Sequence, residues 1–152
     1  MKNLLRTVAV FFVFSILISC DNDEIELKED FKIEYGSVCG WCAGEEFITV
    51  TSSQIEYYRN IPCGDNKGTT QKSRKISASE WNEIISSVDY SKFKKLEYNT
   101  CNVCVDGCDE IIRITENNND HEIRYSVSDE IEEVKKTRQI LSALLENMRE
   151  KR

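Results

Sequence analysis

The feature that most constrains the fold of this chain of 152 residues is its set of seven cysteines. Six of them follow position 38. They comprise two C-x-x-C pairs, Cys39 with Cys42 and Cys101 with Cys104, and the single Cys63 and Cys108. An even number of cysteines in an exported domain predicts three disulfides, each of which fixes two segments side by side. Six cysteines allow fifteen connectivities, and their spacing does not choose among them.

Two C-x-x-C pairs also suit two other uses of thiols. Four thiolates from two such turns can bind tetrahedral zinc, although the 58-residue spacer between Cys42 and Cys101 is far longer than in compact zinc ribbons. A C-x-x-C turn that opens a helix instead activates its first thiol for redox exchange. Here a strand-like sequence begins at Glu46, soon after Cys42. We therefore favour structural disulfides, with metal binding and redox exchange as the alternatives.

The first 19 residues have the organisation of a secretory signal. Lys2 and Arg6 form a basic start, and the run from Val8 to Ile18 is apolar except for Ser15. As a helix this run extends about 17 Å, which is too short for a bilayer core of about 30 Å. We expect residues 1–19 to be removed on export.

The signal ends in Leu17-Ile18-Ser19-Cys20, which resembles the lipobox of bacterial lipoproteins. This resemblance implies cleavage before Cys20, diacylation of its thiol and acylation of the new amino terminus. Several acyl chains anchor a protein more firmly than a single chain does. The acidic run 21–24 is similar to the export signal of many lipoproteins of Bacteroidota. That similarity implies the outer face of the outer membrane and hence the cell surface, with the periplasmic face as the alternative.

The chain as a whole resembles the small cysteine-rich lipoproteins of Bacteroidota. The resemblance covers residues 20 to 148 and is carried by a cysteine before a strand hairpin and by Asp106-Gly107-Cys108-Asp109. It implies a location and a fold style, and no reaction. We expect a signal peptide over 1–19, a lipidated acidic tether over 20–30 and a single domain over 31–152.

The charge of the chain limits its partners. The formal charge of −7 becomes −9 when Lys2 and Arg6 are lost with the signal. An acidic domain lacks the basic face that nucleic-acid binding needs. We expect two partners, the membrane through the lipid anchor and a protein.

The sequence offers no set of catalytic residues. His121 is the only histidine and is expected in a solvated hairpin turn. Asp109 and Glu110 are the only acidic pair beside a turn and two cysteines, and strand alternation directs their side chains to opposite faces. No phosphate-binding glycine loop is present. We expect a non-catalytic binding domain without a cofactor; the alternative is a thiol redox or metal-handling protein.

Alternating apolar and polar residues predict two similar strand hairpins. Residues 46–51 align with 110–115, and residues 55–57 align with 123–125. In each hairpin the apolar residues share one face, so the other face is expected to lie in water. The 117–120 run of asparagines and aspartate predicts a turn that tolerates left-handed backbone.

Helical patterns follow the two hairpins. Ser77 and Glu80 form a capping box before an apolar stripe, and Ser128 is expected to cap the last helix. A strand is predicted over 31–35 and an edge strand over 72–76, after a loop at 64–71. Together these elements predict an α+β two-layer sandwich, with an antiparallel sheet and helices on one face, built from two ββα-like repeats.

Two aromatic residues are candidate contact sites. Trp41 lies between two cysteines and is expected to pack over a disulfide, the alternative being an exposed contact residue. Tyr58 alternates with the core residue Tyr57 and is a candidate for surface contact.

Lipidation of Cys20 is directly testable. Cys20→Ala should release the protein from the membrane fraction and remove the mass of the acyl chains, because the thiol is their attachment point. Membrane fractionation and intact mass spectrometry measure both effects. A variant that stays membrane-bound at the mass of the natural protein would contradict the lipobox interpretation.

Overall fold

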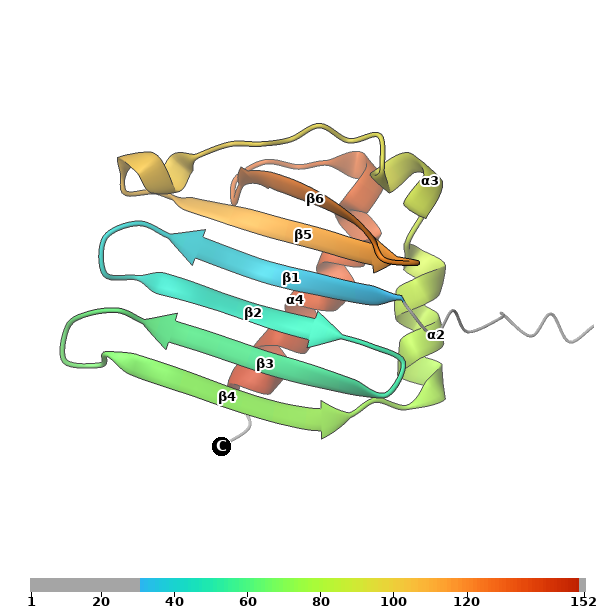
Figure 1. Cartoon of the computed structure of the whole chain (residues 1–152), viewed down its shortest axis with the longest axis horizontal. Helices are drawn as coiled ribbons and strands as arrows, with labels where there is room; N and C mark the ends of the chain where they lie inside the picture. The colour runs from blue at the N-terminus through green and yellow to red at the C-terminus, as the bar shows by residue number, and fades with distance from the viewer. Residues whose placement is uncertain (1–30, 151–152) are drawn as a thin grey trace, which may run out of the picture.

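The computed structural model describes residues 31–150, in which six strands form one antiparallel sheet. The strands are β1 (Lys32–Cys39), β2 (Gly44–Val50), β3 (Gln54–Ile61), β4 (Gly68–Lys75), β5 (Cys108–Glu116) and β6 (Asn119–Ser126). Their order across the sheet is β4-β3-β2-β1-β5-β6, so β1 pairs with both β2 and β5 (Figure 1). The expected signal (1–19) and tether (20–30) lie outside the described residues.

Within the described part of the chain, three helices accompany the sheet. They are α2 (Ala78–Ser87), α3 (Tyr90–Phe93) and α4 (Lys135–Glu150), with the 3-10 turns η2 (Asn102–Val105) and η3 (Glu132–Val134). In Figure 1, α4 runs obliquely behind the central strands and α2 lies at one end of the sheet. The combination of an antiparallel sheet and helices confirms the α+β class. Within residues 31–150 no helix is both long and apolar enough to span a membrane.

The hydrophobic core lies between one face of the sheet and the helices. Ile48 and Val50 of β2 and Ile112 and Ile114 of β5 are buried, as their alternation predicts. The helices contribute a second set of buried side chains: Trp81, Ile84, Leu141, Leu145 and Met148. Full burial of such a side chain contributes about 1.5–3 kcal/mol, so this face of the sheet holds the domain together.

Some element boundaries differ from the sequence expectations. The capping box of Ser77 and Glu80 is present. The last helix begins at Lys135, not after Ser128, because residues 132–134 form a 3-10 turn that first brings Val134 into the core. Residues 68–71, expected as loop, belong to β4, because Thr69 and its neighbours pair with the end of β3.

The two similar hairpins flank β1, and each carries an ionic cluster on the helix side. Ser37 of β1 lies between Glu46 of β2 and Glu110 of β5. Each glutamate accepts a hydrogen bond from a tyrosine of the outer strand and from an arginine of α4. The two clusters are Glu46 with Tyr57 and Arg149, and Glu110 with Tyr125 and Arg138. The two halves of the domain differ in the order of their elements, because β4 lies between the first hairpin and α2.

The outer edge strand β4 carries inward-pointing cations. Lys72 Nζ donates to the carbonyl oxygens of Met148 and Arg149 at the end of α4, each at 3.1 Å. Arg74 pairs with Glu80 at 2.8 Å. Cations suit the negative end of a helix dipole, and inward charges on an edge strand oppose pairing with a further strand. We therefore do not treat the β4 edge as a binding site.

Candidate functional site

All six cysteines of the domain form disulfides, and the three bonds gather at one end of the sheet. Cys39 bonds to Cys108, Cys42 to Cys63 and Cys101 to Cys104. The first bond joins the ends of β1 and β5, whose two cysteines lie opposite each other in the register. The second ties the β1–β2 loop to the β3–β4 loop, and the third closes η2. We call this end of the domain the turn end.

The disulfide pairing bears on the alternatives of metal binding and redox exchange. Cys39 and Cys42 belong to two different bonds, so the first C-x-x-C does not form an exchange disulfide. Cys101 and Cys104 are bonded to each other and exposed. Among residues 31–150 no group of three or more His, Cys, Asp or Glu side chains is arranged to hold a metal ion.

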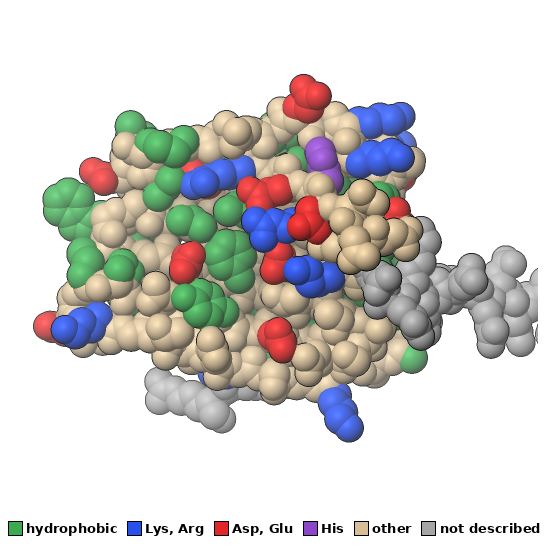
Figure 2. All heavy atoms as spheres, viewed as in Figure 1, with side chains coloured by type: hydrophobic (Ala, Val, Ile, Leu, Met, Phe, Trp, Pro, Cys, Tyr) green, Lys and Arg blue, Asp and Glu red, His purple; other side chains and the backbone are tan. Residues whose placement is uncertain are grey.

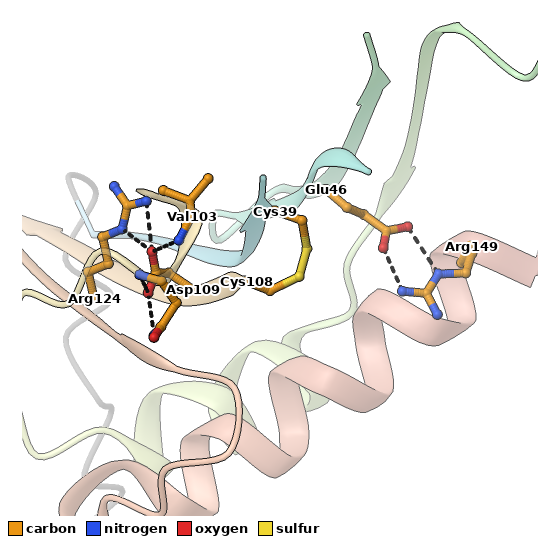
Figure 3. Close-up of a disulfide and its surroundings, with 8 residues drawn as sticks. Cys39, Glu46, Val103, Cys108, Asp109, Arg124 and Arg149 are labelled. Atoms are coloured by element: carbon orange, nitrogen blue, oxygen red, sulfur yellow. Dashed lines mark hydrogen bonds and ion pairs between the residues drawn. A yellow bond between two sulfur atoms is a disulfide. The ribbon is translucent and has the colours of Figure 1, made fainter. Parts of the chain in front are cut away.

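A buried carboxylate, Asp109, organises the loop that contains Cys101 and Cys104. Its oxygens accept hydrogen bonds from the Thr100 hydroxyl at 2.8 Å and from the backbone N–H groups of Asn102 at 3.0 Å and Val103 at 3.2 Å. Arg124 of β6 pairs with the same carboxylate at 2.9 Å. Figure 3 shows the contacts of Asp109 with Val103 and Arg124 beside the Cys39–Cys108 bond. Asp109 thus fixes η2 to the sheet.

The same network determines the electrostatics around Cys101. Burial alone would raise the pKa of Asp109, but the hydrogen bonds from Asn102, Thr100 and Val103 outweigh burial and hold that pKa well below its usual range. The N–H groups at the start of η2 therefore point at a permanent negative charge. These N–H groups, which could otherwise stabilise an anion at the start of the turn, are thus already occupied by the Asp109 carboxylate.

Asp109 and Glu110 serve separate structural networks. Asp109 pairs with Arg124 under the segment that leads into η2, whereas Glu110 pairs with Arg138 of α4 at 2.6 Å. The partners come from opposite sides of the sheet, as strand alternation requires. The two carboxylates therefore do not act together on one substrate.

Trp41, at the tip of the β1–β2 loop, is exposed. Its side chain is 81% accessible, so the expectation that it packs over a disulfide is wrong, and the alternative of an exposed residue holds. Its φ of 55° lies in the left-handed region, which costs a bulky residue about 1–2 kcal/mol. The neighbouring loop carries Val105, which is 78% exposed.

The two loops that bear Trp41 and Val105 are held in fixed contact. The Gly40 N–H donates to the Gly107 carbonyl at 2.9 Å. A Cβ added at Gly40 would lie only 2.8 Å from the Asp106 Cα, so the two backbones touch. Disulfides flank this contact on both sides. Trp41 and Val105 therefore project from a cross-linked platform.

The sheet face that the helices leave uncovered forms a shallow groove of about 500 Å³. Its lining combines four apolar side chains with charged residues: Val38, Phe47, Tyr58, Ile111, Glu34, Glu45, Arg113, Glu122 and Arg124, with Thr49. Figure 2 shows hydrophobic side chains gathered on this face towards the turn end. We call this surface the open-face groove. Tyr58, a candidate contact residue from the sequence, lies in it.

His121 lies at the other end of the sheet and is not a solvated turn residue. It belongs to β6, pairs with Ile114 and is half-buried. Its Nε2 lies 3.0 Å from the Leu96 carbonyl, and its ring meets Phe93 edge-on at 5.3 Å. The turn instead consists of Asn117 and its neighbour, both left-handed as predicted. His121 therefore has a packing role.

The structure brings together part of what the sequence singled out. The cysteines, Trp41 and Asp109 meet at the turn end, whereas the lipidation site Cys20 lies outside the described residues. Sequence reasoning missed Arg124, Arg138 and the open-face groove, because residues distant in the chain create them. No protein-family model matches this chain, and no curated protein is significantly similar to it.

Replacing Asp109 tests its organising role. Asp109→Asn should lower the free energy of unfolding by about 3 kcal/mol at pH 7, because Arg124 loses its counterion in a partly buried site. The folded-state pKa lies below the unfolded value of about 4, so this stabilisation is present above pH 4 and is lost as the pH falls further. Urea unfolding at pH 7, 4 and 2 measures it.

The exposed Asp120→Asn serves as the matched control and should change stability little at any of these pH values. A difference between the natural protein and Asp109→Asn that stays constant down to pH 2 would show that the charge of Asp109 does not provide the stabilisation.

Proposed function

We propose that this protein is a membrane-anchored lipoprotein whose disulfide-bonded domain binds a protein partner and catalyses no reaction. The lipid on Cys20 is the anchor, in the outer membrane, with the domain at the cell surface; the periplasmic face is the alternative. The turn end is the recognition site, and Trp41 is its principal contact residue.

The observation that carries the proposal is the exposure of Trp41 on a cross-linked platform. A side chain that is 81% accessible contributes little to the core, and its left-handed backbone opposes folding. Trp is among the residues most enriched at interface hot spots, where the burial of a large ring in a partner supplies much of the affinity. Disulfides that immobilise such a loop reduce the entropy lost on binding.

The position of the anchor fits the same function. The chain enters β1 at Lys32, and β1 carries it about 25 Å to Cys39 at the turn end. The start of β1 and the β1–β2 loop, which carries Trp41, therefore lie at opposite ends of the sheet (Figure 1). A lipid at the amino terminus leaves the turn end available to another protein.

We also propose that the fold is a two-layer sandwich derived from two ββα-like units. Two facts support this history: the matching sequences of the hairpins, and the matching clusters around Glu46 and Glu110 on either side of β1. Strand β4 is then an addition to the first unit.

Site-specific photo-crosslinking tests the recognition site. Benzoylphenylalanine in place of Trp41 should give an adduct of defined mass in intact cells, because it replaces one exposed aromatic ring by another. The same amino acid in place of the exposed Glu83 on α2 is the matched control and should give none.

A second variant, Trp41→Asn, separates the loss of the partner contact from a loss of folding. Trp41→Asn should keep the domain folded and raise its free energy of unfolding by up to about 1 kcal/mol, because asparagine tolerates left-handed backbone. In the crosslinking experiment, equal amounts of adduct with benzoylphenylalanine at positions 41 and 83, or no adduct at either position, would contradict the proposed recognition site.

Thiol–disulfide exchange is the second candidate function, because Cys101 and Cys104 form an exposed C-x-x-C disulfide. We expect the purified protein to reduce a disulfide substrate no faster than the dithiothreitol supplied with it, because Asp109 already occupies the N–H groups of Asn102 and Val103 that could stabilise an attacking thiolate. Turnover above that background, lost in Cys101→Ser, would establish exchange as the function instead.

A further inference from the structure

A glycine of the central strand lies between two lining residues of the open-face groove. Gly36 of β1 lies opposite Phe47 of β2 and Ile111 of β5. A Cβ at this position would lie 2.6 Å from the Phe47 ring, so the ring leans over the bare backbone of Gly36. A glycine within a strand often marks such a close approach. The half-buried ring of Phe47 thereby forms part of the apolar floor of the groove.

This floor is continuous with the turn end. Val38 and Glu45 are paired across β1 and β2, next to the loop that carries Trp41. Both line the groove, as does Tyr58 of β3, which lies opposite Phe47. A partner that contacts Trp41 therefore meets an apolar surface that extends along the sheet.

The charges of the groove are unequally neutralised. Arg113 pairs with Glu34 at 2.9 Å and with Glu122, and Lys32 also pairs with Glu34 at 3.5 Å. The guanidinium of Arg124 pairs with the buried Asp109. Both cations of the groove are thus occupied within the domain.

The remaining charge is the carboxylate of Glu45, whose hydrogen bond comes from the neutral Tyr58 hydroxyl at 3.3 Å. Burial and then the Glu45 carboxylate raise the pKa of Tyr58, so this hydroxyl stays protonated and gives Glu45 no full counter-charge. The groove therefore offers an apolar floor and a net negative end beside Trp41.

We infer that the open-face groove binds a basic segment of the partner protein, with lysine or arginine side chains beside Glu45 and Trp41 and apolar side chains over Phe47 and Tyr58. The exposed indole of Trp41 suits a cation, because aromatic faces attract ammonium and guanidinium groups. A second copy of this acidic chain would bring like charges together, which disfavours it as the occupant. The inference rests on the proposed function and names its class of partner.

A peptide library supplies the probe for the test. Phage-displayed random twelve-residue peptides are selected on the full lipidated protein in nanodiscs, after removal of phage that bind empty nanodiscs. Enriched sequences should carry a net positive charge together with aromatic or aliphatic residues. An enriched peptide, made synthetically, should bind more weakly as salt rises, because salt screens the attraction between charges.

Three variants locate that binding. Glu45→Lys and Tyr58→Ala should each weaken it at least tenfold, and Glu83→Lys, the same charge change on α2, should leave it within twofold. Glu45→Lys retains all apolar contacts, so it remains informative if Tyr58→Ala fails to fold. Neutral or acidic enriched peptides, no enrichment, or equal losses in Glu45→Lys and Glu83→Lys would overturn the inference.

The two proposals can fail separately. Peptide binding that is lost in Trp41→Asn but intact in Glu45→Lys and Tyr58→Ala would keep the turn end as the recognition site and overturn the open-face groove. Peptide binding that is lost only in Glu45→Lys and Tyr58→Ala, with no crosslink at position 41, would keep the open-face groove and overturn the turn end as the recognition site.

Discussion

The central position of β1 is the constraint on which the rest of the domain depends. Two hairpins that are far apart in the chain meet only because β1 pairs with β2 on one side and β5 on the other. The Cys39–Cys108 bond covalently closes the second pairing at the end of the strand, over a sequence separation of 69 residues. Closing so long a loop in the unfolded chain contributes roughly 4 kcal/mol in the chain-entropy account. The same bond sets the loop of Trp41 beside the loop of Val105.

The two faces of the sheet divide the tasks of the domain. The helix face holds the apolar core and the two Glu–Tyr–Arg clusters, whose charges are paired internally. The Arg149–Glu46 pair lies on the helix side of the Cys39–Cys108 bond in Figure 3, away from Asp109. The open face instead keeps Phe47, Tyr58 and Glu45 accessible. Stability and recognition are thereby assigned to different sides of the same strands.

The sequence predicts the elements of this fold better than their contacts. Alternation at Ile48 and Val50, and the Ser77–Glu80 box, identify strands and a helix because their causes are local. The pairing of Cys39 with Cys108 follows from the register of β1 and β5, which spacing alone does not determine.

In the candidate site, too, the sequence predicts local features better than contacts between distant residues. The sequence favours packing of Trp41 on a disulfide, but Trp41 is exposed at the tip of a loop whose backbone is in close contact with the 103–107 loop. The run 117–120 predicts a four-residue turn next to His121, but the turn consists of residues 117 and 118, so β6 begins at Asn119 and includes His121. The open-face groove is formed by residues of several strands in register, so no local sequence pattern predicts it.

Disulfide mapping of the protein, isolated from membranes without reductant, tests the central claim most directly. Chymotrypsin cleaves after Trp41 and separates Cys39 from Cys42, and a protease that cleaves before Asp106 separates Cys104 from Cys108. Mass spectrometry should then find Cys39 linked to Cys108, Cys42 to Cys63 and Cys101 to Cys104. A Cys39–Cys42 link, or free thiols at these positions, would contradict the cross-linked turn end.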